Sequence, residues 1–171
     1  MNGRLRIEQE LQLVSIYSDD GTIVDSIPYC ELTPSDWGYV YERHVAQELA
    51  ANGFEIQMQG LKKGFIDEGI DLVVKSPSNE MIYIQCKYVT QKKISKEKVE
   101  WILYKASSHL EKMYSGKKIK FWLIVPSLRE AFLMKRSPLG REIYPVAQYF
   151  LSKRDIQSKI WLEIHEISMQ R

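Results

Sequence analysis

Two short apolar segments joined by a polar turn constrain the fold of this chain more than any other feature. The segment 69–75 reads GIDLVVK and the segment 81–88 reads MIYIQCKY, and both are rich in the β-branched and aromatic residues typical of strands. Residues 76–80, SPSNE, have the composition of a turn. The sequence therefore predicts a β-hairpin over residues 69–88.

Side-chain alternation in this hairpin sorts its residues onto two faces. One face is expected to carry the apolar set Ile70, Leu72, Val74, Ile82, Ile84 and Cys86, and the other Gly69, Asp71, Val73, Tyr83, Gln85 and Lys87. If the turn is centred on Ser78, Asp71 lies directly opposite Gln85, with Cβ atoms about 4.5–5.5 Å apart. Lys87 then lies two positions beyond. A one-residue slip would scatter the apolar set, so the apolar pattern favours this register.

The polar face offers a carboxylate, an amide and an ammonium, which together suit the hydrolysis of a phosphodiester bond. Mg²⁺ prefers hard oxygen ligands and keeps several waters. Asp71 would supply a carboxylate, Gln85 an amide oxygen and Cys86 its backbone carbonyl. Lys87 would stabilise negative charge on the phosphate or activate the attacking water. The sequence therefore predicts a Mg²⁺ or Mn²⁺ site on this face.

A long helix precedes the hairpin and carries a further acid. Thr33 is expected to cap the helix, Pro34 fits its first position, and Gly53 is expected to end it after Asn52. Glu42 lies at the edge of the apolar stripe, where its carboxylate could lean over the sheet and hold a second metal or a water. The alternative is an ordinary solvated helix glutamate.

These residues resemble the active-site pattern of the restriction-endonuclease-like nuclease superfamily, in the order Tyr41-Glu42, Asp67-Glu68-Gly69-Ile70-Asp71 and Gln85-Cys86-Lys87. The chain looks most like the Mrr-type catalytic domain, in which Gln replaces the usual acid two positions before the Lys. The resemblance covers roughly residues 34–126. It implies a mixed four-stranded sheet flanked by helices and Mg²⁺-dependent cleavage of DNA. It also implies that Asp71 and Gln85 bind the metal, that Lys87 is the catalytic lysine and that Glu42 is the helix acid.

The length of 171 residues suits a single α/β domain. We expect an N-terminal hairpin extension (1–32), a catalytic core (33–126) and a C-terminal helix and strand extension (127–171). Residue patterns predict a hairpin over 11–27, a strand from 54, a helix over 95–114, a buried strand over 119–125, helical stretches within 138–151 and a last strand over 159–167. The expected class is a mixed sheet flanked by helices.

Charge is distributed unevenly along the chain. Residues 1–86 hold 6 Lys/Arg and 14 Asp/Glu, whereas residues 87–171 hold 18 and 8. An acidic half joined to a basic half suits a nuclease, in which acids hold metal and bases hold phosphate. The best candidates for DNA-phosphate contacts lie before and after the hairpin: Lys62, Lys63, Lys92, Lys93 and Lys96. A solvated loop explains these lysines nearly as well.

One face of the helix over 95–114 is open to two interpretations. It gathers lysines around an aromatic residue: Lys98, Trp101, Lys105, Ser108 and Lys112. Such a face can hold a nucleic-acid backbone and stack a base. It can also be a solvated lysine face on which the C-terminal segment covers Trp101, and this is the interpretation that we favour.

The expected function is a metal-dependent DNA endonuclease of restriction or Mrr-like type. The alternatives are a catalytically silent DNA-binding or assembly module on the same fold, and a junction- or flap-specific resolvase. Cutting both strands of a duplex suggests a homodimer. The short N-terminal extension leaves target specificity to loops, the C-terminal segment or a separate partner. The sequence has no membrane-length apolar run and no secretory signal core, so a cytoplasmic protein is expected.

Overall fold

A five-stranded sheet forms the centre of the computed structural model, which describes residues 3–59, 69–89, 92–113, 115–153 and 159–170. The strand order is β10-β7-β6-β5-β4. The strands are β4 (Glu55–Gln59), β5 (Leu72–Lys75), β6 (Met81–Cys86), β7 (Ile119–Val125) and β10 (Ile160–Glu166). β7 pairs parallel with both β6 and β10, whereas β5 pairs antiparallel with β4 and β6. This mixed sheet confirms the expected fold class.

The fifth strand goes beyond the four implied by the family resemblance. β10 comes from the C-terminal segment and runs beside β7 from the Ile160–Ile119 pair to the Glu166–Val125 pair. The final strand predicted over residues 159–167 is therefore confirmed, and it belongs to the same sheet as the hairpin.

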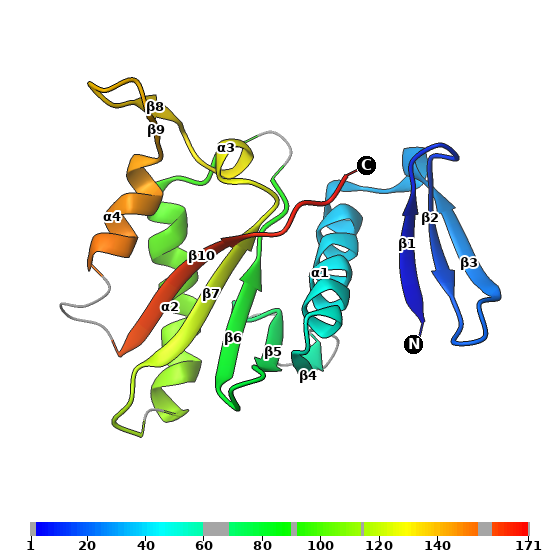
Figure 1. The fold of residues 1–171 in the computed structure, drawn as a ribbon, viewed down its shortest axis with the longest axis horizontal. Helices are drawn as coiled ribbons and strands as arrows, with labels where there is room; N and C mark the ends of the chain where they lie inside the picture. The colour runs from blue at the N-terminus through cyan, green and yellow to red at the C-terminus, as the bar shows by residue number, and fades with distance from the viewer. Residues whose placement is uncertain (1–2, 60–68, 90–91, 114, 154–158, 171) are drawn as a thin grey trace.

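Helices cover both faces of the sheet (Figure 1). On one face, α1 (Pro34–Ala51) buries Tyr41 and Val45 in a core shared with β5 and β6. On the other, α2 (Lys96–Leu110) and α4 (Pro145–Lys153) pack in a second core that includes Ala106 and Ala147. α2 is also the crossover between the parallel strands β6 and β7, a connection that parallel pairing requires.

α1 begins and ends where the sequence predicts. The Thr33 side chain accepts a hydrogen bond from the Asp36 amide (3.2 Å), and the Asp36 carboxylate accepts one from the Thr33 amide (2.9 Å). This reciprocal capping box satisfies donors that have no partner within the helix. Gly53, with φ of 84°, follows the last turn and allows the chain to leave in a left-handed conformation.

The N-terminal segment forms a separate three-stranded antiparallel sheet in the order β1-β2-β3. The predicted hairpin corresponds to β2 (Leu13–Tyr17) and β3 (Ile23–Pro28), while β1 (Arg4–Glu8) was not predicted. The side-chain amide of Gln47, on α1, makes two hydrogen bonds with the backbone of Leu5. Its oxygen accepts from the Leu5 N–H (2.6 Å) and its nitrogen donates to the Leu5 carbonyl (2.9 Å). The small sheet is thus fixed to the helix that carries Glu42.

Three short elements lie between β7 and α4: the single-turn helix α3 (Leu128–Ala131) and the two-residue strands β8 (Lys135–Arg136) and β9 (Glu142–Ile143). Two 3-10 turns lie earlier in the chain, one before α1 (Tyr29–Glu31) and one after α2 (Glu111–Met113). The helical stretch predicted within 138–151 is present only from Pro145 onward, because residues before it pair as β8 and β9 around Gly140. Within the described residues, no helix has the length and apolar character needed to cross a membrane.

Candidate active site

The β5–β6 hairpin has the register that the sequence predicts. Leu72 pairs with Ile84 and Val73 pairs with Tyr83, so the next position brings Asp71 opposite Gln85. The Asp71 amide still donates to the Ile84 carbonyl (2.8 Å), although the ladder of β5 itself begins only at Leu72. Asp71 therefore lies at the mouth of the hairpin, where the two chains begin to separate.

One predicted face assignment is wrong. Ile70 was expected beside Leu72 and Val74, but it is buried in the opposite core, the one shared with α2. Strict alternation applies only within a strand, and residues 69–71 precede β5. Gly69 has φ of 72°, and a Cβ on it would lie 3.2 Å from the Cβ of Lys105. The chain thus turns tightly against α2 just before Asp71.

Three of the predicted metal-binding groups converge at this point. The Gln85 amide nitrogen donates to Asp71 Oδ2 in a very short contact and to the Cys86 carbonyl at 3.2 Å. The Cys86 backbone N–H also donates to Asp71 Oδ2, at 2.6 Å. Gln85 is only 4% exposed, so these bonds satisfy its buried amide. The amide presents nitrogen to Asp71, and its oxygen can serve a cation there only if the group turns over.

Glu42 joins this cluster electrostatically. It is a partly buried residue of α1, and burial together with the nearby Asp71 carboxylate raises its pKa to about 7, while Lys87 acts in the opposite direction. Burial also raises the pKa of Asp71, opposed by Lys87 and by the hydrogen bonds from Cys86 and Gln85. Glu42, Asp71 and Lys87 are therefore close enough for the charge of each to influence the others.

The donor set suits a hard divalent cation. Two carboxylates that are both desolvated and close enough to disfavour one another's charge gain most from a cation between them. Across the described ranges there is no group of three or more His, Cys, Asp or Glu side chains arranged for a metal. A cation here would complete its coordination shell with amide, carbonyl and water oxygens, as Mg²⁺ does in proteins.

A groove of about 670 Å³ opens from Lys87 toward the N-terminal half of α2. Most of its polar side chains are cationic, and its lining residues are Lys87, Tyr88, Val89, Lys92, Lys93, Ile94, Ser95, Glu97, Lys98 and Trp101. We call this the basic groove. The sequence predicted the lysines of this groove. It did not predict that Tyr88, Val89 and Ile94 line the groove between Lys87 and the other lysines, because their positions depend on the path of the chain after β6.

The five lysines predicted to contact DNA lie in different environments. Lys92 is exposed and lines the basic groove. Lys93 also lines it, but its ammonium donates to the carbonyls of Arg129 (2.6 Å) and Glu130 (2.7 Å) of α3. Lys96 lies over the Tyr149 ring, 4.2 Å from its centroid, and 3.7 Å from Glu100. Lys62 and Lys63 lie outside the described residues.

Trp101 is 50% exposed, so the expectation that the C-terminal segment covers it is wrong. The contact from that segment is made elsewhere on α2: Tyr149 of α4 reaches Lys96, in the first turn of the helix. The aromatic side chain of Trp101 therefore remains available at the wall of the basic groove.

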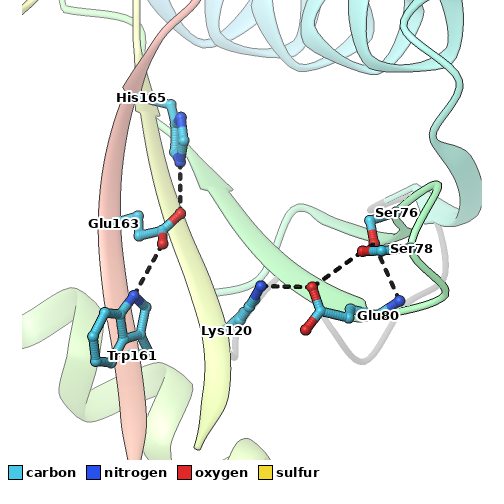
Figure 2. Close-up of polar contacts among 7 residues, drawn as sticks. All are labelled: Ser76, Ser78, Glu80, Lys120, Trp161, Glu163 and His165. Atoms are coloured by element: carbon cyan, nitrogen blue, oxygen red, sulfur yellow. Dashed lines mark hydrogen bonds and ion pairs between the residues drawn. The ribbon is translucent and has the colours of Figure 1, made fainter.

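A separate polar cluster lies on β10, on β7 and in the turn before β6 (Figure 2). Glu163 accepts a hydrogen bond from the Trp161 indole (2.9 Å) and contacts His165 Nε2 (3.0 Å). Lys120 pairs with Glu80 at 2.6 Å. Trp161, Glu163 and His165 alternate along β10 and share one face of it. These residues are convenient controls, since they are polar and partly exposed but do not line the basic groove.

One family model matches the part of the chain that contains these residues. Residues 37–115 match the model of a restriction endonuclease family, the Mrr-type catalytic domain. The match spans α1, the hairpin and α2, and so includes Glu42, Asp71, Gln85 and Lys87. No curated protein and no solved structure matches the chain. The match over residues 37–115 thus agrees with the Mrr-type, restriction-endonuclease-like resemblance seen in the sequence.

Proposed function

We propose that this chain is a Mg²⁺- or Mn²⁺-dependent endonuclease that hydrolyses phosphodiester bonds in DNA. The observation that carries the proposal is the convergence of Asp71, Gln85 and the Cys86 carbonyl at the mouth of the hairpin, with Glu42 and Lys87 in the same electrostatic cluster. Lys87 also lines the basic groove, so the cluster lies at the end of a surface suited to a polyanion.

The chain's own groups have distinct roles in this proposal. Asp71 and Glu42 supply the negative charge that holds the cation. The Cys86 carbonyl adds a neutral oxygen ligand, and the Gln85 amide adds another when it turns its oxygen toward Asp71. The Cys86 N–H bond to Asp71 Oδ2 fixes the orientation of that carboxylate and leaves Oδ1 as the oxygen we assign to the cation. A bound Mg²⁺ would stabilise charge on the phosphate and lower the pKa of a water.

Lys87 has two tasks. In the free protein its ammonium partly compensates the carboxylates, since it lowers the pKa of both Asp71 and Glu42. With substrate bound, it faces the groove and neutralises charge that develops on the scissile phosphate. A neutral side chain of similar length would perform neither task, which makes Lys87→Met the informative substitution.

The basic groove is the proposed path of the DNA. Lys92 and Lys98 line it and supply phosphate contacts, whereas the ammonium of Lys93 is engaged by α3. Cleavage of both strands of a duplex requires two sites, so we propose a homodimer for that reaction. A separate partner that recognises the target sequence would act together with it.

One observation favours the alternative of a catalytically silent DNA-binding module. The Gln85 amide nitrogen hydrogen-bonds to Asp71, and a carboxylate satisfied in this way needs no cation. The two functions differ in their response to metal. A silent module binds DNA with the same affinity whether or not Mg²⁺ is present, and it leaves the DNA intact.

Nicking of supercoiled plasmid DNA tests the proposal, with Mg²⁺, Mn²⁺ or EDTA. We expect metal-dependent nicking that Asp71→Asn and Lys87→Met each reduce by at least about 100-fold, the scale of losing one main electrostatic group. Lys120→Met is the matched control, because it removes a lysine of β7 that does not line the basic groove, and it should retain activity. Nicking that survives both Asp71→Asn and Lys87→Met would refute the assignment.

A further inference from the structure

Two aromatic side chains form an exposed stack where the basic groove meets α2. Trp101 is 50% exposed and Tyr104 is 68% exposed. Their ring centroids are 5.6 Å apart and their planes differ by 21°, so they form a nearly parallel pair. We call Trp101 and Tyr104 the aromatic platform. Contiguous exposed apolar surface of this kind marks sites of interaction on proteins.

Cationic groups surround the aromatic platform. Lys105 lies with its ammonium 5.6 Å from the centroid of the Trp101 ring. Lys98 lines the basic groove together with Trp101, one helical turn earlier in α2. Positive charge beside an exposed π face is the combination with which proteins bind single-stranded nucleic acid, where lysines neutralise the backbone and aromatic rings stack on the bases.

The two strands of an intact duplex cannot use this platform well. Bases in a duplex are stacked on their neighbours, so they offer edges in the grooves and no free π face. An unpaired base does offer one. Because a single groove is lined by both Lys87 and Trp101, a strand lying in it can place a phosphate at Lys87 and a nearby base on the platform.

We propose that the aromatic platform stacks an unpaired base of the substrate, so that this nuclease acts on DNA with a single-stranded segment beside the scissile phosphate. The proposal rests on the function proposed above and narrows its substrate class. It assigns Trp101 as a specificity-determining residue, with Tyr104 supporting its ring and Lys98 and Lys105 holding the backbone.

Binding measured without chemistry tests this inference separately from cleavage. Fluorescence anisotropy in EDTA would compare a labelled 20-nucleotide dT strand with a hairpin duplex of similar charge, using the full chain. We expect Trp101→Leu to weaken binding of the dT strand by roughly 5- to 30-fold, which corresponds to about 1–2 kcal/mol of stacking. Duplex binding should change by less than about 2-fold, because phosphate contacts dominate it.

Three further variants keep the result interpretable. Trp101→Phe retains a stacking face and should restore most of the affinity for the dT strand. Tyr104→Ala removes a mainly exposed ring and should weaken dT binding in the same sense as Trp101→Leu. Trp161→Leu is the matched control, since it removes a partly buried indole on β10, and it should leave both affinities unchanged. Circular dichroism confirms that each variant is folded.

The outcomes separate this inference from the proposed function. If Trp101→Leu weakens dT and duplex binding equally, or affects neither, the aromatic platform does not stack a base and the inference is overturned. If no substrate is cleaved in Mg²⁺, only the nuclease proposal fails, while a selective loss of dT binding still supports the platform. In Mg²⁺, we expect Trp101→Leu to lose the preference for forked over linear duplex DNA.

Discussion

Replacing Glu42 by Gln should stabilise the metal-free protein at alkaline pH. The folded chain holds this carboxylate in a partly buried position near Asp71, which raises its pKa from an ordinary value of 4.5 to about 7. Glutamine keeps the shape of the side chain and removes the charge. Two partly buried carboxylates held close together for a cation destabilise the protein when no metal is bound. The gain in stability on replacing Glu42 by Gln measures the size of that destabilisation.

The magnitude follows from the linkage between protonation and folding. The unfolded chain releases this proton near pH 4.5 and the folded chain only near pH 7, so the stability of the wild type falls as pH rises through this interval. The interval corresponds to a ceiling of about 3.4 kcal/mol. Glu42 is only partly buried, so solvent screening reduces the cost, and we expect about 1–2 kcal/mol at pH 8. The substitution also removes a negative charge near Asp71, whose pKa is raised as well, and this further stabilises the folded protein.

Thermal unfolding at several pH values provides the assay. We expect Glu42→Gln to raise the melting temperature in EDTA by roughly 2–8 °C at pH 8, with the gain vanishing near pH 4.5. Excess Mg²⁺ should narrow the gap by stabilising the wild type. Glu48→Gln is the matched control, because Glu48 is an exposed acid of the same helix, and it should show no such pH dependence. A gain that is the same at both pH values, or a loss of stability at pH 8, would show that the folded chain does not raise the pKa of Glu42.

Four further substitutions test the turn before Asp71, the proposed metal ligand Gln85 and two lysines of the basic groove. Gly69→Ala should destabilise the fold by about 1–2 kcal/mol in urea unfolding, because φ of 72° and the 3.2 Å approach to Lys105 Cβ both disfavour a side chain; an unchanged midpoint would contradict the tight turn before Asp71. Gln85→Glu should tighten Mg²⁺ binding in calorimetric titrations while lowering stability in EDTA, because it adds a carboxylate and removes the donor to Asp71; weaker Mg²⁺ binding would argue against a ligand role. Lys92→Ala should reduce the salt dependence of DNA binding by about one ion, whereas Lys93→Ala should mainly lower the melting temperature, and the reverse pattern would contradict the positions described for them.

The hairpin shows why sequence pattern could predict the centre of the site. A turn of defined length and strict alternation fix which residues face one another, and the register of the Leu72–Ile84 pair, extended by one position, gives the predicted opposition of Asp71 and Gln85. The predicted face of Ile70 was wrong because strict alternation does not hold outside the paired strands. It lies one residue outside the ladder, where Gly69 turns the chain and alternation no longer applies.

Features that depend on tertiary packing were beyond the reach of local patterns. β1 was missed because its charged residues alternate in a strand that needs Gln47 of α1 to bind its backbone. The exposure of Trp101 depends on where α4 packs, which no period in the sequence encodes. The orientation of the Gln85 amide likewise depends on tertiary contacts, because its nitrogen donates hydrogen bonds to both the Asp71 carboxylate and the Cys86 carbonyl.

Electron paramagnetic resonance of Mn²⁺ tests most directly whether these groups build a cation site. The signal of free aqueous Mn²⁺ falls as the ion binds, so a titration gives both the number of sites and their affinity. We predict one site per chain in the wild type, lost in Asp71→Asn and retained in Lys120→Met. Equal binding by the wild type and Asp71→Asn would show that the mouth of the hairpin does not hold the metal.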